Sequence, residues 1–118
     1  INFSASGVHK GFLKPPHSVH RSALGYIPIP VISIKIGTGP SVLLTAGVHG
    51  DEYEGQVTLT KLVKEITPDQ VNGQIIIVPM TNFPAAKAGL RTSPIDDLSS
   101  PTDTSTVWSK TKPTSTDR

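Results

Sequence analysis

A histidine and a glutamate stand three residues apart in a glycine-rich stretch, and together they could bind a metal ion. His49 and Glu52 lie within residues 47–55, which read Gly-Val-His-Gly-Asp-Glu-Tyr-Glu-Gly. This stretch directly follows the apolar run at residues 41–46, which is typical of a buried strand. A neutral imidazole nitrogen and a carboxylate oxygen are ligands that zinc accepts. The pattern favours a zinc site at the carboxyl end of a strand.

The same residues also have a purely structural explanation. Acidic residues in the first turn of a helix complement the helix dipole, and glycines ease a tight turn from strand to helix. Two protein ligands are too few for a catalytic zinc, which needs three and an open position for water. The other histidines lie in an arm containing proline and serine, where surface positions are the simpler interpretation: His9, His17 and His20. Spacing alone leaves metal binding and a plain helix start both open.

Arg91 is the second candidate for chemistry. It follows residues 82–90, which read as a loop after a strand. A guanidinium near a metal could stabilise an oxyanion or bind a carboxylate through two hydrogen bonds. The alternative is a solvated surface arginine. Asp96 and Asp97 could orient a metal ligand or simply form a turn.

Composition excludes several classes of function. The chain has 118 residues, which is enough for one modest domain, and a formal net charge of +2. That charge is too small to indicate binding to nucleic acid or to an anionic membrane. There is no cysteine, so neither disulfides nor thiolate ligands are available. No apolar run approaches the roughly 18 residues of a spanning helix, and no signal peptide is visible, so a cytoplasmic location is the default expectation.

The elements expected around His49 form a strand–helix–strand unit. Residues 1–26 read as an irregular arm with at most one short strand. Residues 31–36 alternate apolar and polar and follow two prolines, which predicts a strand at a sheet edge. After a turn at residues 37–40, the run at 41–46 is expected to pair antiparallel with that strand and to be covered on both faces.

A helix is predicted at residues 56–66, where Leu59, Leu62, Val63 and Ile66 form an apolar stripe. A buried strand is predicted at residues 74–78, parallel to the run at 41–46. Ligands collect beyond the carboxyl ends of strands in such sheets, which is where His49 and Glu52 fall.

Composition changes abruptly at residue 99. Of the last 20 residues, 13 are Ser, Thr or Pro. Such a segment cannot bury enough apolar surface to offset the entropy lost on ordering. We therefore expect residues 1–98 to form the domain and residues 99–118 to be a disordered tail, unrelated to it or out of frame.

Several motifs together resemble the succinylglutamate desuccinylase/aspartoacylase family, which consists of zinc-dependent deacylases related to zinc carboxypeptidases. The matching segments are residues 43–55, 76–79, 82–85 and 91–96. Within that family the chain is most similar to the N-acetyl-diaminobutyrate deacetylases, judged also from residues 11–15.

The resemblance implies a fold and a reaction. The fold would be the N-terminal part of a three-layer α/β/α sandwich around a mixed sheet. His49 and Glu52 would be two zinc ligands, and Arg91 would polarise the scissile carbonyl and contact the substrate. The substrate would be a small N-acyl amino acid, and water activated by Zn²⁺ would hydrolyse its amide bond.

The sequence also departs from the family. After Leu98 the family continues with Asn-Leu-Asn-Arg, whereas this chain reads Ser-Ser-Pro-Thr. The third zinc ligand and the general-base glutamate have no counterpart. We therefore expect a truncated domain that is inactive alone, or alternatively a non-catalytic interaction domain. Strand edges exposed by truncation would make oligomers plausible.

Overall fold

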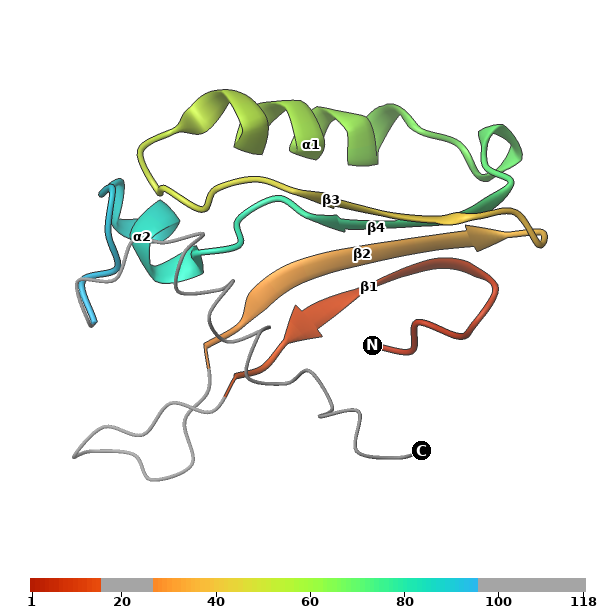
Figure 1. The fold of residues 1–118 in the computed structure, drawn as a ribbon, viewed down its shortest axis with the longest axis horizontal. Coiled ribbons are helices and arrows are strands. Elements are labelled where there is room, and N and C mark those ends of the chain that lie inside the picture. Colours follow the sequence, from red (N-terminus) through yellow and green to blue (C-terminus); the bar gives the residue numbers. More distant parts are fainter. Residues whose placement is uncertain (16–26, 96–118) are drawn as a thin grey trace, which may run out of the picture.

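The computed structural model describes residues 1–15 and 27–95. These residues form a four-stranded sheet in the order β1-β2-β4-β3, with helix α1 along one side of it (Figure 1). The strands are β1 (Gly7–Leu13), β2 (Ile29–Ile36), β3 (Ser41–Thr45) and β4 (Gly73–Val78). The helices are α1 (Tyr53–Glu65), the 3-10 turn η1 (Pro68–Gln70) and α2 (Phe83–Ala88). The sheet is mixed, since β2 is antiparallel to β1 and β4, whereas β3 is parallel to β4.

The predicted edge position of residues 31–36 is wrong, because β2 lies inside the sheet. Its residues pair with β1 on one side and with β4 on the other. The pairing with β4 covers Ile32–Ile36 only, so Pro30 precedes it and is paired only with Phe12 of β1. The proline therefore interrupts no ladder between β2 and β4. The predicted arm before β2 contains a full seven-residue strand, β1.

The predicted pairing of residues 41–46 with residues 31–36 is also wrong. β3 pairs with β4 and in parallel, as the strand–helix–strand prediction required. The turn at residues 37–40 therefore does not close a hairpin. It connects β2 to β3, and β4 lies between these two strands in the sheet. The prediction that β3 is covered on both faces is wrong as well, since most of its residues are exposed.

Helix α1 carries the predicted apolar stripe onto the sheet. Leu59 is buried in a core cluster that also contains Ile32, Ile34, Val71 and Ile77. Leu62, Val63 and Ile66 pack against this cluster, as does Leu44 of β3. The helix begins at Tyr53, three residues before the predicted start. Its packing holds the β3–α1 loop at one end of the sheet.

The segment at residues 82–90 is a short helix rather than the predicted loop. The Asn82 side chain accepts a hydrogen bond from the Ala85 N–H at 3.4 Å and so caps the first turn. Pro84 stands in that first turn, where its missing N–H costs nothing. Gly89 ends the helix with a φ of 67°, in the left-handed region. Arg91 stands two residues after Gly89, so the end of α2 determines where the Arg91 side chain starts.

Several predicted features fall outside the described residues. They are the tail at residues 99–118, the boundary at Leu98, His17, His20, Asp96 and Asp97. Across residues 1–15 and 27–95, no helix is long and apolar enough to cross a bilayer.

Candidate metal centre

The loop that carries His49 and Glu52 is fastened to the loop that follows β4. The Thr81 N–H donates to the Ala46 carbonyl at 2.8 Å, and the Asn82 N–H donates to the Gly47 carbonyl at 2.9 Å. The two loops therefore continue the parallel pairing of β3 and β4 beyond the sheet. Figure 1 shows α2 and the β3–α1 loop at this same end. The loop of His49 and Glu52 thus lies beyond the carboxyl ends of two parallel strands, the position that the sequence predicted for it.

Glycine is required at two positions of the His49 loop. Gly47 has a φ of +69°, which other residues rarely adopt. Gly50 is buried against the backbone of α2, and a Cβ atom there would collide with the Ala85 carbonyl group and the Ala86 nitrogen. Gly50 thus lets the loop lie directly on α2, which brings His49 near the segment that carries Arg91.

A glutamine that the sequence did not single out also holds this loop. The side-chain amide of Gln56 donates to the Gly50 carbonyl at 3.3 Å and to the Glu52 carbonyl at 3.2 Å. The Glu52 N–H donates in turn to the His49 carbonyl at 3.3 Å. These contacts fix the turn between His49 and Glu52. No spacing rule would have identified Gln56, because its role depends on the path of the loop.

The structure brings the three predicted site residues together. Arg91 Nη1 lies 3.4 Å from Glu52 Oε1, and Arg91 Nη2 lies 3.3 Å from His49 Nε2. One guanidinium therefore contacts both side chains that were predicted to bind zinc. The Arg91 and Glu52 side chains are 60% and 58% exposed, so water screens this ion pair and its contribution to stability is small.

The donor atoms present fit part of a zinc site. A histidine nitrogen and a carboxylate oxygen face a single cationic group, which here is Arg91. His49 Nδ1 is buried and has no hydrogen-bond partner among the described residues. A buried polar atom of this kind is commonly satisfied by an ion or by a group from elsewhere in a protein. Imidazole and carboxylate are also the donor types that zinc accepts in the absence of thiolates.

The site holds two donor side chains of this type. Within residues 1–15 and 27–95, no group of three or more His, Asp or Glu side chains is placed to hold a metal. His9 lies on β1, where its Nε2 is 2.8 Å from the Ser6 carbonyl oxygen, and it does not join His49. His17, His20, Asp96 and Asp97 are outside the described residues.

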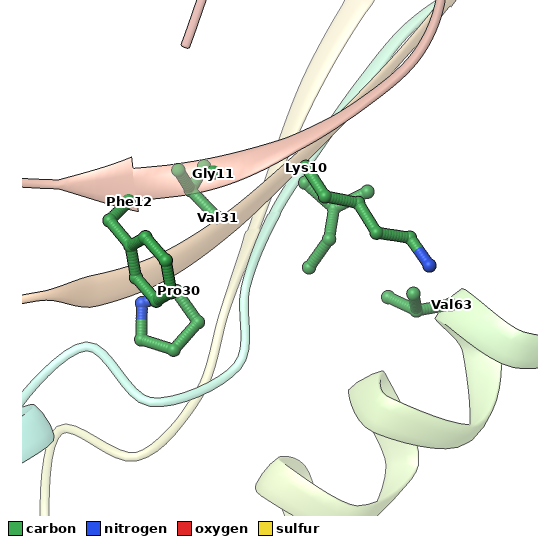
Figure 2. A pocket seen from close by; sticks show the side chains of 7 residues that line it. Lys10, Gly11, Phe12, Pro30, Val31 and Val63 are labelled. Carbon is green, nitrogen blue, oxygen red and sulfur yellow. The ribbon is translucent and has the colours of Figure 1, made fainter.

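A cavity of about 300 Å³ lies elsewhere, between the β1–β2 face and α1 (Figure 2). Its lining is largely apolar and includes Phe12, Pro30 and Val63, with Lys10 as the charged member. None of the three site residues lines it. The cavity therefore contributes nothing to the chemistry at His49.

Comparison with known proteins identifies the family of this chain. Residues 38–100, just over half of it, match the succinylglutamate desuccinylase/aspartoacylase catalytic domain. The chain is 53% identical over 96 residues to the N-alpha-acetyl-L-2,4-diaminobutyric acid deacetylase of Halomonas elongata. This match covers 81% of the chain and 28% of that protein.

Solved structures agree with the sequence match. The product-bound ectoine utilization protein EutE (DoeB) of Ruegeria pomeroyi superposes with a TM-score of 0.80 at 50% identity, and the match covers 84% of this chain and 30% of that one. A succinylglutamate desuccinylase/aspartoacylase of Rhodobacter sphaeroides superposes with a TM-score of 0.78 at 41% identity, with the same coverage.

These findings confirm the predicted α/β fold with its mixed sheet and the predicted resemblance to the diaminobutyrate deacetylases. The chain spans 28% of the length of the curated relative and 30% of the two solved chains. It belongs to the succinylglutamate desuccinylase/aspartoacylase family.

Proposed function

We propose that this chain forms part of the active site of a zinc-dependent hydrolase that removes an acyl group from a small N-acyl amino acid. Family membership supports the reaction class. The name of the Halomonas elongata relative supports an N-acetylated diaminobutyric acid as the first substrate to test. Neither nucleic acid nor a membrane is a proposed partner, because the net charge is only +2.

One observation carries the proposal. The Arg91 guanidinium contacts Glu52 Oε1 at 3.4 Å and His49 Nε2 at 3.3 Å. Residues from two separate loops therefore face one another beyond the carboxyl ends of β3 and β4. A plain helix start would account for Glu52 and its neighbours, but it would not explain why His49 and Arg91 converge on the same point.

Each of the three residues takes a role that its chemistry allows. His49 and Glu52 would hold the zinc ion, which when bound supplies a Lewis acid and lowers the pKa of a water molecule. Arg91 would donate hydrogen bonds to the carbonyl oxygen as negative charge develops on it, or to the carboxylate of the substrate. The Arg91 side chain is 60% exposed, so it has room to turn from Glu52 toward a substrate.

The metal site formed by the described residues would be incomplete. A catalytic zinc site needs three protein ligands, and no group of three such side chains is found among the described residues. His49 and Glu52, which both contact Arg91, would supply two. We therefore propose that these 118 residues bind zinc weakly and do not turn over substrate without further residues. The disordered tail at residues 99–118 and a cytoplasmic location stay predictions.

Hydrolysis of N-acetyl-diaminobutyric acid in the presence of zinc tests this proposal, together with isothermal calorimetry of zinc binding. We expect no turnover above background, and zinc binding that His49→Ala weakens about 100-fold or more, since even indirect partners of a metal ligand cost 10–100-fold. His9→Ala is the matched control, because His9 lies on β1 away from the site, and it should bind zinc as the native chain does. Equal binding by His49→Ala and the native chain would refute the proposed ligand.

The alternative is a non-catalytic interaction domain that keeps only part of the metal site. The exposed apolar residues of β3 favour it, because such strands commonly pair with another chain. Turnover well above background by the purified chain would exclude this alternative. An absence of zinc binding by the native chain would favour it over the zinc-dependent hydrolase.

A further inference from the structure

The half-buried side chain of Gln56 lies inside the loop that carries His49. Its amide nitrogen is 3.3 Å from the Gly50 carbonyl oxygen and 3.2 Å from the Glu52 carbonyl oxygen. Its Cδ atom lies against Gly47, where an added Cβ would come within 3.2 Å of it. Gly47 therefore leaves room for the carboxamide, which spans the loop from within.

The position inside the loop requires a hydrogen-bond donor. Both partners of the Gln56 amide are backbone carbonyl oxygens, which accept hydrogen bonds and cannot donate them. The amide group has two N–H donors, one for each carbonyl. A carboxylate of the same shape would place oxygen against oxygen at both contacts. The loop therefore needs the donors of Gln56 and not merely a side chain of its size.

Three hydrogen bonds close the backbone from His49 to Glu52. Two come from Gln56, and the third runs from the Glu52 N–H to the His49 carbonyl at 3.3 Å. Glu52 is the N-cap residue of α1, but its side chain makes no capping hydrogen bond. Its carboxylate instead contacts Arg91, which also contacts His49. The closed backbone thus leaves both donor side chains directed at one point.

A role in helix stability alone would explain only one of the two Gln56 contacts. The bond to the Glu52 carbonyl reaches four residues back and lies within the first turn of α1. The bond to the Gly50 carbonyl reaches six residues back, to a residue outside the helix. This second contact ties the loop to the helix and does not stabilise the helix itself.

We propose that Gln56 is a positioning residue for the metal donors. Its two hydrogen bonds hold His49 and Glu52 in the arrangement that receives the cation before the cation binds. It contacts neither the metal nor the substrate and acts through the loop backbone. Groups that orient metal ligands commonly change metal affinity about 10–100-fold. The inference rests on the proposed zinc site and adds to it a residue that binds no metal.

Two variants of similar size test this role in the full chain. Gln56→Met removes both donors and adds no charge, whereas Gln56→Glu removes them and adds a negative charge. We expect calorimetry to show a zinc affinity at least about tenfold lower than native in both. Electrostatics alone predicts the opposite for Gln56→Glu, because a negative charge near a cation strengthens its binding. The sign of that change separates positioning from charge.

Hydrogen exchange in the zinc-free chain is the second readout. The Glu52 N–H closes the turn, so nuclear magnetic resonance should show that it exchanges at least about tenfold faster in Gln56→Met. The Ile66 N–H donates to the Leu62 carbonyl at 2.9 Å at the other end of α1 and should exchange as in the native chain. A general loss of stability would speed exchange at both ends of the helix.

Thr58→Glu is the matched control. Thr58 is exposed on the same helix, and its hydroxyl donates to the Glu54 carbonyl at 2.6 Å within α1. This variant adds the same charge as Gln56→Glu and leaves both Gln56 hydrogen bonds in place. Its zinc affinity should equal or exceed that of the native chain, and its Glu52 N–H should exchange at the native rate.

Four results would overturn the proposal. They are an unchanged zinc affinity in Gln56→Met, a higher zinc affinity in Gln56→Glu, an equal loss in Thr58→Glu, and native exchange of the Glu52 N–H in Gln56→Met. A native chain that binds no zinc would instead refute the proposed metal site and with it the purpose assigned to Gln56. The exchange rates of the zinc-free chain would still show whether Gln56 fixes the turn.

Discussion

Arg91 Nη1 lies 3.4 Å from Glu52 Oε1, although the two residues are 39 positions apart in sequence. The contact depends on two loops that are fastened together beyond β3 and β4 and on the seating of Gly50 against α2. The same guanidinium reaches His49 Nε2 at 3.3 Å. A positive group therefore already stands beside both donors proposed for zinc and would oppose the binding of a cation there.

Replacing Arg91 with alanine should strengthen zinc binding by the isolated chain. A unit charge about 4 Å from another contributes about 1 kcal/mol in water, and about 2 kcal/mol when the other charge is a divalent ion. Removal of the Arg91 charge should therefore raise zinc affinity about 30-fold. Arg91→Lys keeps the charge and should change the affinity less. Calorimetric titration of the three proteins with zinc measures the difference, and weaker binding by Arg91→Ala than by the native chain would contradict the proposed geometry.

Replacing Gly50 with alanine should destabilise the chain through the contact with α2. The new methyl group would meet the backbone of Ala85 and Ala86, which cannot move aside as a flexible side chain can. We expect a loss of about 1–3 kcal/mol in the free energy of unfolding, the usual cost of overpacking. Urea unfolding followed by circular dichroism measures it.

Gly11→Ala is the control for this substitution. Its new Cβ would lie 3.1 Å from the Ile1 Cβ, and Ile1 is a terminal residue that is 44% exposed. We expect a change within about 0.5 kcal/mol. Similar losses of unfolding free energy in Gly50→Ala and Gly11→Ala would show that the contact of Gly50 with α2 does not stabilise the chain more than an ordinary position does.

Removing the cap of α2 should also lower stability. Asn82 accepts the Ala85 N–H through its side chain, and the loss of such a cap typically costs about 1 kcal/mol. Asn82→Ala should therefore unfold at a lower urea concentration than the native chain. Asn82→Ser keeps a capping oxygen, so its urea midpoint should be close to that of the native chain. Equal midpoints for the alanine and serine variants would argue against the cap.

The elements that the sequence predicted correctly are those with strong periodicity. The stripe of Leu59, Leu62 and Val63 located α1, and the apolar run at residues 74–78 located β4. The convergence of His49 and Glu52 at a strand end followed from the strand–helix–strand order. Local pattern and final position agree in these cases because each element buries one apolar face against the other.

The strand pairings of residues 31–36 and 41–46 were predicted wrongly because the strand that pairs with both, β4, lies far away in sequence. Nothing within residues 31–46 reveals that β4 would insert between the two strands. The sequence did not predict the exposure of Leu43. An apolar run such as residues 41–46 predicts a buried strand, whether or not other residues pack on it in the structure. The signal for α2 did exist, since Asn82 before Pro84 and Gly89 at the end are a typical start and stop of a helix.

Zinc titration followed by nuclear magnetic resonance of the histidine ring nitrogens is the most direct test of the proposed metal site. The chain has four histidines, so the others serve as internal references in the same sample. We expect zinc to shift the His49 ring signals first and Glu52→Gln to reduce this shift, while the His9 signals stay in place. Zinc that shifts the signals of the other histidines and leaves those of His49 in place would contradict the assignment of His49 and Glu52 as its ligands.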